Sequence, residues 1–243
     1  MNKKLNSFLK TFSSRVDLYS VSLLVLTLFI LSFSVLCDNQ FEERIIDPMD
    51  KTIALTFDDG PDPVYTAMIL DVLKEKGVKA SFFLVGNKMK QNPKVTERIY
   101  KEGHCMANHT MTHVSLLGKS FSSVSKGILQ TEKMLDSICG GSSKLFRPPW
   151  GEITKEQKVS LKKLGFKIIL WDVNSEDFKA KITVNDIVYN VMKGAGDKRI
   201  ILFHDSDYLG KAARKNTALA LPQVIDFLKG MGYHFVTISE MED

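Results

Sequence analysis

Short apolar stretches alternate along this chain with longer segments whose apolar residues recur every three or four positions. The longer segments predict helices at residues 64–76, 93–102, 121–138, 154–164, 184–192 and 217–229, and a glycine follows closely after each of them. The apolar stretches predict strands at residues 52–57, 80–85, 104–107, 144–146, 167–171, 199–203 and 234–237. Seven strands that alternate with helices indicate an α/β fold with a parallel sheet, either open and doubly wound or closed into a barrel.

Polar residues that can carry chemistry follow the ends of these predicted strands. In a barrel, the carboxyl ends of all strands surround one mouth, where barrel enzymes hold their catalytic groups. An open sheet would spread the same residues along a line that is too long for one metal ion. The barrel is therefore the favoured fold. The residues concerned are Asp58 and Asp59 after the first strand, His109 after the third, Arg147 after the fourth, Asp172 and Asp177 after the fifth, and His204 after the sixth.

Asp58 and Asp59 are adjacent carboxylates in the sequence Thr-Phe-Asp-Asp-Gly-Pro. A plain turn is the alternative interpretation, because Asp, Gly and Pro dominate turns for backbone reasons. Two neighbouring carboxylates at the end of a buried strand repel each other, however, and require a cation or a shared proton. The pair therefore indicates a site for a cation.

His109 and His113 are four residues apart, a spacing that lets two imidazoles reach one ion from a helical turn. Taken alone, the pair is equally compatible with a surface or capping role. Together with Asp59 it supplies three ligands of a tetrahedral divalent site and leaves the fourth position for water. We therefore predict one divalent ion held by Asp59, His109 and His113, with Zn²⁺ expected and Co²⁺ or Ni²⁺ also compatible. Asp58 is then free to act as a base.

Arg147 and His204 add two further candidates for the same mouth. Arg147 begins the sequence Arg-Pro-Pro-Trp-Gly, which by itself is a stiff loop, but its guanidinium can fork onto Asp58 and hold that carboxylate ionised. His204 follows the apolar run at residues 200–203 and, viewed alone, is as compatible with the core as with catalysis. Its place at the barrel mouth favours acid catalysis.

The N-terminal part of the chain predicts a membrane segment. Residues 19–37 contain no charged side chain and would span about 28 Å as a helix. Basic residues precede this run and acidic residues dominate after it, which places the N-terminus in the cytoplasm and the rest of the chain outside. We expect a cytoplasmic tail at 1–16, an anchor or signal segment at 17–37, a linker at 38–49 and a catalytic domain at 50–243. A cleaved signal peptide and a lipid-modified Cys37 are the alternatives.

Composition and charge exclude some classes of protein. With 44% hydrophobic and 25% charged residues among 243, the chain can bury one sizeable core. The formal charge of +5 does not indicate a nucleic-acid partner, since the N-terminal tail supplies much of it. The three cysteines imply no disulfide, and the sequence does not define the oligomeric state.

These motifs, taken in order, resemble the polysaccharide deacetylase family of metal-dependent carbohydrate esterases, which includes chitin, peptidoglycan and nodulation-factor deacetylases. The resemblance covers residues 50–240 and rests on several separated motifs. It implies a distorted (β/α) barrel with about seven parallel strands. It also implies removal of N-acetyl, less often O-acetyl, groups from sugar polymers.

The resemblance assigns a role to each matching residue of this chain. It implies that Asp58 is the general base, oriented by Arg147, and that Asp59, His109 and His113 bind the metal. His204 resembles the general acid, tuned by Asp177. Trp150 would offer its backbone N–H to the oxyanion and Leu202 would line the acetyl pocket. Two positions depart from many relatives, which carry Asp in place of Asn174 and Trp in place of Phe178, so Phe178 gives a smaller apolar wall.

The expected function is therefore metal-dependent hydrolysis of acetamide groups on a cell-envelope or extracellular polysaccharide, with N-acetylglucosamine units as the expected site. Hydrolysis of a small cyclic amide or imide within the same fold is one alternative. A non-catalytic glycan-binding module is another, but such a module would be expected to have lost a ligand or the base. A membrane-anchored structural protein would leave the ordered polar residues unexplained.

Overall fold

The computed structural model describes residues 51–141, 143–207 and 214–242, which belong to one compact unit, Met49–Asp243. The tail, the membrane segment at 17–37 and the linker expected from the sequence lie outside these residues. Within the described ranges, no helix is both long enough and apolar enough to cross a bilayer.

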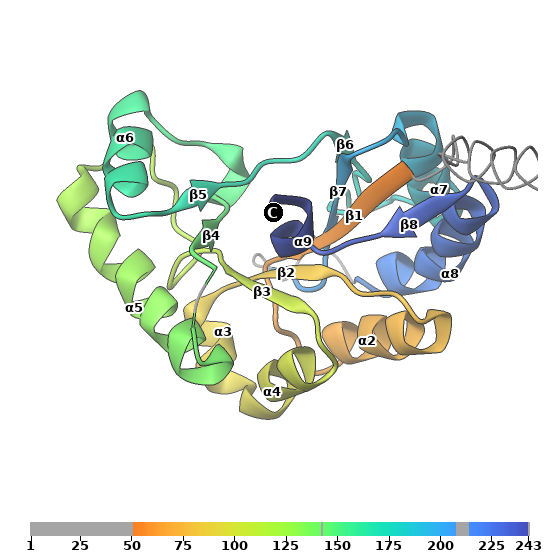
Figure 1. The fold of residues 1–243 in the computed structure, drawn as a ribbon, viewed down its shortest axis with the longest axis horizontal. Coiled ribbons are helices and arrows are strands. Elements are labelled where there is room, and N and C mark those ends of the chain that lie inside the picture. The colour runs from red at the N-terminus through yellow and green to blue at the C-terminus, as the bar shows by residue number, and fades with distance from the viewer. Residues whose placement is uncertain (1–50, 142, 208–213, 243) are drawn as a thin grey trace, which may run out of the picture. The chain divides into compact units, whose positions relative to one another are not determined.

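Parallel strands form one curved sheet with helices around its outside (Figure 1). Along the sheet the order is β5-β4-β3-β2-β1-β7-β6, and β8 pairs with the start of β1. The strands are β1 (Lys51–Asp58), β2 (Ser81–Leu84), β3 (Cys105–Asn108), β4 (Leu145–Phe146), β5 (Lys167–Ile168), β6 (Val173–Asn174), β7 (Arg199–His204) and β8 (Tyr233–Phe235).

All six predicted helices are present, with ends within a few residues of those expected. The structure adds two short helices and one 3₁₀ turn that carry too few apolar residues to produce a periodic pattern. The helices are α2 (Tyr65–Lys76), α3 (Gly86–Gln91), α4 (Pro93–Lys101), α5 (Phe121–Cys139), α6 (Lys155–Lys163), α7 (Val184–Gly194), α8 (Lys215–Gly230) and α9 (Ile238–Glu242), and the 3₁₀ turn is η1 (Pro149–Gly151).

Strand β1 supplies both the core and the start of the site, because successive side chains of a strand point to opposite faces. Ile53, Leu55 and Phe57 pack outward in the main core with residues of α2, α7 and α8. Ala54 belongs to a smaller inner cluster together with Ile238 of α9, which lies in the middle of the ring of strands in Figure 1. Asp58 has the same inward parity as Ala54 and is paired in register with His204 of β7.

The segment 167–174 connects the two ends of the sheet. Its first residues pair with β4 as β5, and its last residues pair with β7 as β6. Between them, Ile169 still donates to the Phe146 carbonyl and Asp172 to the Ile200 carbonyl, but residues 169–172 belong to neither strand. The strand predicted at residues 167–171 is therefore wrong in extent. The side chain of Arg147 reaches this gap and donates to the carbonyls of Ile169 and Leu170. The fold is thus an incompletely closed parallel barrel, which agrees with the distorted (β/α) barrel expected.

Candidate active site

A cavity of about 480 Å³ lies where the barrel strands end. Its lining contains the predicted carboxylates Asp58 and Asp59 and the three predicted imidazoles, and aromatic side chains form part of its wall. The lining residues are Asp58, Asp59, His109, His113, Trp150, Trp171, Asn174, Phe178, Ala180, Leu202, His204, Asp207 and Arg214.

Asp59, His109 and His113 form a buried cluster whose candidate ligand atoms lie within 4.8 Å of one another. Asp59 Oδ1 lies 3.0 Å from His113 Nε2 and 3.4 Å from His109 Nε2. The two histidines lie on an irregular turn after β3, so the helical turn that their spacing suggested is wrong. Thr110 and His113 adopt positive φ angles of 67° and 49° in this turn, and both rings approach Asp59.

Hydrogen bonding makes this cluster a good fit for a divalent cation. His109 Nδ1 lies 2.7 Å from the carbonyl oxygen of Arg147 and must donate to it, because a carbonyl only accepts. In the neutral ring, Nε2 therefore presents a lone pair toward the Asp59 carboxylate, and a proton or a cation is required between them. One carboxylate and two imidazoles in a buried site form a donor set that Zn²⁺ accepts.

Electrostatics also favour an ionised Asp59. Burial alone would raise the pKa of Asp59, but hydrogen bonds with His109 and His113 hold it well below its usual range. The carboxylate is thus ionised at neutral pH, as a metal ligand must be.

Buried polar contacts from α5 support the turn that carries the histidines. Asn108 immediately precedes His109, and its side-chain amide donates to Glu132 Oε2 at 2.8 Å and to the Ile128 carbonyl at 2.9 Å. The amide oxygen of Asn108 accepts from the backbone N–H of Thr110 at 3.0 Å. These contacts fix the start of the turn, and neither Asn108 nor Glu132 was predicted from the sequence.

Asp58 and Arg147 form a buried ion pair beside this cluster. Arg147 is fully buried, and its Nη1 lies 2.7 Å from Asp58 Oδ1 and 2.9 Å from the Thr56 hydroxyl. Its guanidinium also lies 3.9 Å over the ring of Phe83. Burial lowers the pKa of Arg147, and the Asp58 carboxylate opposes that fall. The predicted contact between Arg147 and Asp58 is present, but it is made by Nη1 alone and not as a fork, because Nε and Nη2 donate to backbone carbonyls.

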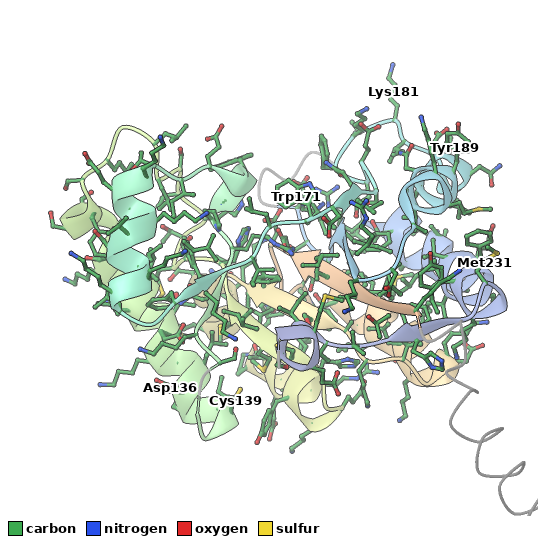
Figure 2. All side chains as sticks on the ribbon, turned by 45° about the horizontal axis from the view of Figure 1, so that its top comes forward. Asp136, Cys139, Trp171, Lys181, Tyr189 and Met231 are labelled. Carbon is green, nitrogen blue, oxygen red and sulfur yellow. The ribbon has the colours of Figure 1, made fainter. Side chains whose placement is uncertain are left out.

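Trp150 lies in η1 with a φ of 58°, and 52% of its surface is exposed. Its ring meets the ring of His113 edge-on, with centroids 4.5 Å apart. Gly151 follows with a φ of 72° and packs so closely on Trp171 that a Cβ there would lie 2.9 Å from the indole. Trp171, labelled in Figure 2, therefore packs against the turn that carries Trp150, and no sequence pattern predicts it as part of the site.

His204 and Asp177 form the second functional pair. His204 Nδ1 lies 2.7 Å from Asp177 Oδ1, and the backbone N–H of His204 donates to Asp177 Oδ2 at 2.8 Å. Burial alone would lower the pKa of His204, but the Asp177 carboxylate raises it to about 9. Burial alone would raise the pKa of Asp177, but the nearby His204 lowers it below its usual value. The pairing predicted from the sequence is present.

The remaining predicted residues line the cavity near His204. Leu202 is buried, and Phe178 is 46% exposed with its ring edge toward the imidazole of His204. Asn174 accepts the backbone N–H of Glu176 at 2.8 Å and so stabilises the turn that leads to Asp177. A carboxylate can accept the same hydrogen bond, which explains how either Asn or Asp serves at this position.

A buried carboxylate–imidazole cation site beside a second carboxylate, with a protonated imidazole in the same cavity, is the arrangement of a metal-dependent hydrolase. Residues 46–169 match the sequence profile of the polysaccharide deacetylase family. The chain belongs to this family.

Several characterised proteins are similar to the chain. A peptidoglycan N-acetylglucosamine deacetylase of Bacillus cereus is 37% identical over 79% of this chain and 88% of its own length. The peptidoglycan N-acetylmuramic acid deacetylase PdaC of Bacillus subtilis is 38% identical over 83% of this chain, which spans only 41% of PdaC. The solved structure of PdaC superposes with a TM-score of 0.71 at 38% identity, covering 81% of this chain and 92% of the PdaC chain in that structure. The crystal structure of the Bc1960 peptidoglycan N-acetylglucosamine deacetylase, in complex with 4-naphthalen-1-yl-N-oxidanyl-benzamide, superposes with a TM-score of 0.75 at 36% identity. The match covers 80% of this chain and 89% of the Bc1960 chain.

Proposed function

We propose that the chain removes N-acetyl groups from peptidoglycan, acting on N-acetylglucosamine units. The observation that carries this proposal is one cavity lined by the Asp59–His109–His113 cluster, by Asp58 and by His204. Behind its wall, Asp58 is paired with the buried Arg147, and His204 is paired with the buried Asp177. The similarity to the Bacillus cereus enzyme over most of both chains supports the same substrate.

Asp59, His109 and His113 would hold the metal, and Zn²⁺ is the ion we propose, because this donor set suits it. A divalent ion held there would supply Lewis-acid chemistry, polarising the acetyl carbonyl and making water more acidic. A glycan-binding module without catalysis would not need this set beside a second, separately oriented carboxylate.

Asp58 is proposed as the general base. The Arg147 guanidinium at 2.7 Å occupies Asp58 Oδ1, while Oδ2 lies on the side of His109, 3.9 Å from its Nε2. Asp58 therefore keeps one oxygen directed toward the site, where it can take the proton of an attacking water molecule.

His204 is proposed as the general acid. Because its Nδ1 is hydrogen-bonded to Asp177, its Nε2 is the atom that can donate a proton to the departing amine. A pKa of about 9 keeps the ring protonated at neutral pH, as a proton donor requires. The Trp150 backbone N–H would stabilise the negative charge on the acetyl oxygen, a contact worth roughly 3 to 4 kcal/mol. Leu202 and Phe178 would enclose the acetyl methyl group.

Mass spectrometry tests this proposal directly. Purified protein is incubated with defined peptidoglycan fragments, and the products are fragmented to locate each acetyl group. Loss of acetyl from N-acetylglucosamine supports the proposal, whereas loss only from N-acetylmuramic acid would assign the activity of PdaC instead. Fragments that stay fully acetylated at every metal tested would refute deacetylase activity on this polymer.

We also propose that the catalytic domain lies outside the cytoplasm, tethered by residues 19–37. The uncharged apolar run with basic residues before it supports this orientation, and a cell-wall substrate is consistent with it. Protease added to cells with an opened outer layer should digest the domain. Protection until the inner membrane is broken would reverse the orientation.

A further inference from the structure

The start of α8 contacts the pair of residues that we assign to proton donation. Arg214 immediately precedes α8, and Thr217 lies in its first turn. Residues three apart in a helical turn share a face, and both of these side chains are turned toward Asp177 and are almost fully buried. Neither residue follows the end of a strand, so the pattern of polar residues at strand ends does not predict them.

Thr217 completes the hydrogen bonding of the Asp177 carboxylate. Its hydroxyl donates to Asp177 Oδ2 at 2.8 Å. The same oxygen accepts the His204 backbone N–H, while Oδ1 lies against the imidazole. With a donor on each side, the carboxylate plane is fixed, and the plane of the carboxylate determines where the imidazole points.

Arg214 connects the loop that carries Asp177 with the loop that follows His204. Its Nη1 donates to the carbonyl of Asp177 at 2.7 Å, and its Nε donates to the carbonyl of Ser206 at 3.0 Å. The nearest carboxylate that it meets among the described residues is Asp207, with Oδ1 at 3.8 Å from Nη2. A buried guanidinium that donates mainly to carbonyls carries a desolvation cost. The planar guanidinium donates to both loops at once from fixed directions, which a Lys ammonium could not reproduce.

We infer that Arg214 and Thr217 are positioning residues for proton donation, acting through Asp177 to direct His204 Nε2 at the leaving group. This inference rests on the proposed function of His204. It implies that both residues affect substrates whose leaving group needs a proton and have little effect on substrates whose leaving group does not.

Thr217→Val is the sharpest test, because Val keeps the shape of Thr and removes only the hydroxyl. We expect turnover of an N-acetylglucosamine oligomer to fall about tenfold with little change in KM, which is the scale of a lost hydrogen bond to a charged group. Turnover of an aryl acetate should fall less than about twofold, since a phenolate departs without protonation. Thr217→Ser keeps the hydroxyl and should recover most of the lost rate. Arg214→Met should reproduce the selective loss.

Asn216→Ala is the matched control. Asn216 lies between the two residues in sequence, and its side-chain amide donates to the Ile182 carbonyl at 2.9 Å. The variant therefore removes a hydrogen bond made by the same helical turn, but one that does not involve Asp177. It should show no difference between amide and ester. Metal content and thermal unfolding are measured for each variant.

The outcomes separate this inference from the function on which it rests. Equal losses on amide and ester, an unchanged Thr217→Val, or a selective loss in Asn216→Ala would each refute the positioning role while leaving deacetylation intact. A wild-type protein that cleaves neither substrate would refute both.

Discussion

Replacing Asp177 by Asn tests the proposed acid most directly. The carboxylate is buried and holds three donors, one of which is the imidazole of His204. An Asn amide has only one accepting oxygen, so in either orientation its NH₂ group faces a donor. The charge that favours the imidazolium is lost as well.

The size of the effect follows from the structure. Burial lowers the pKa of His204, but the Asp177 carboxylate, with smaller contributions from Asp59 and Asp58, raises it from 6.5 to about 9. An opposite charge in contact shifts a pKa by roughly one to three units. A fall of about two units would reduce the protonated fraction of His204 at pH 8 roughly tenfold, so the alkaline limb of the activity profile should move to lower pH.

The assay is the pH dependence of kcat/KM on an acetylated oligomer, which reports the free enzyme. Glu176→Gln is the control, because Glu176 lies in the same loop but pairs with Lys179 on the surface. It removes a similar charge and should leave the limb in place. An unchanged alkaline limb in Asp177→Asn at full metal content would refute the pairing as the source of acidity.

The same substitution has a signature in stability. The raised pKa of His204 contributes stability that is fully present below about pH 6.5 and is lost as pH rises through about 9. The lowered pKa of Asp177 contributes stability above about pH 4, lost as pH falls through the folded value. Asp177→Asn should therefore destabilise the protein most near pH 5 to 6, by about 3 kcal/mol, as measured by denaturant unfolding.

Three further substitutions test other parts of the site. His113→Ala should lower bound metal below one equivalent by elemental analysis, and full retention would remove it from the ligand set. Asp58→Asn should keep the metal but lose about two to four orders of magnitude in turnover. A variant that stayed active without metal would instead make Asp58 the metal ligand and Asp59 the base. Gly60→Ala should cost about 1 to 3 kcal/mol in urea unfolding, because its Cβ would meet Asp205 Oδ2, whereas Gly230→Ala has open space and should cost less than 1 kcal/mol.

The positions of strands and of the main helices could be predicted from the sequence because their signals are local. The apolar run before Asp58 and the periodic pattern of α8 each lie within one element. Side chains of Asp58 and His204 could be placed together because parallel strands end on one side, and the structure pairs them in register.

Contacts made by the rest of the site depend on the path of loops, for which a single sequence carries little signal. The irregular turn at His109–His113 depends on Asn108, whose buried amide is held by Glu132 of a distant helix. Arg214 becomes part of the site only because α8 begins beside Asp177. Strand 167–171 was expected as one element because its apolar run does not reveal a change of partner strand.

At the seam between β5 and β6, one side chain contributes both to barrel closure and to the chemistry of the base. Where backbone pairing stops, Arg147 binds the carbonyls of Ile169 and Leu170, and the same guanidinium holds Asp58. A substitution of Arg147 would therefore remove its contacts across the seam and its ion pair with Asp58 at the same time. A loss of activity in such a variant could not be assigned to one of these two effects. A protein that dispensed with this arginine would need a new way to close its seam before it could change its base.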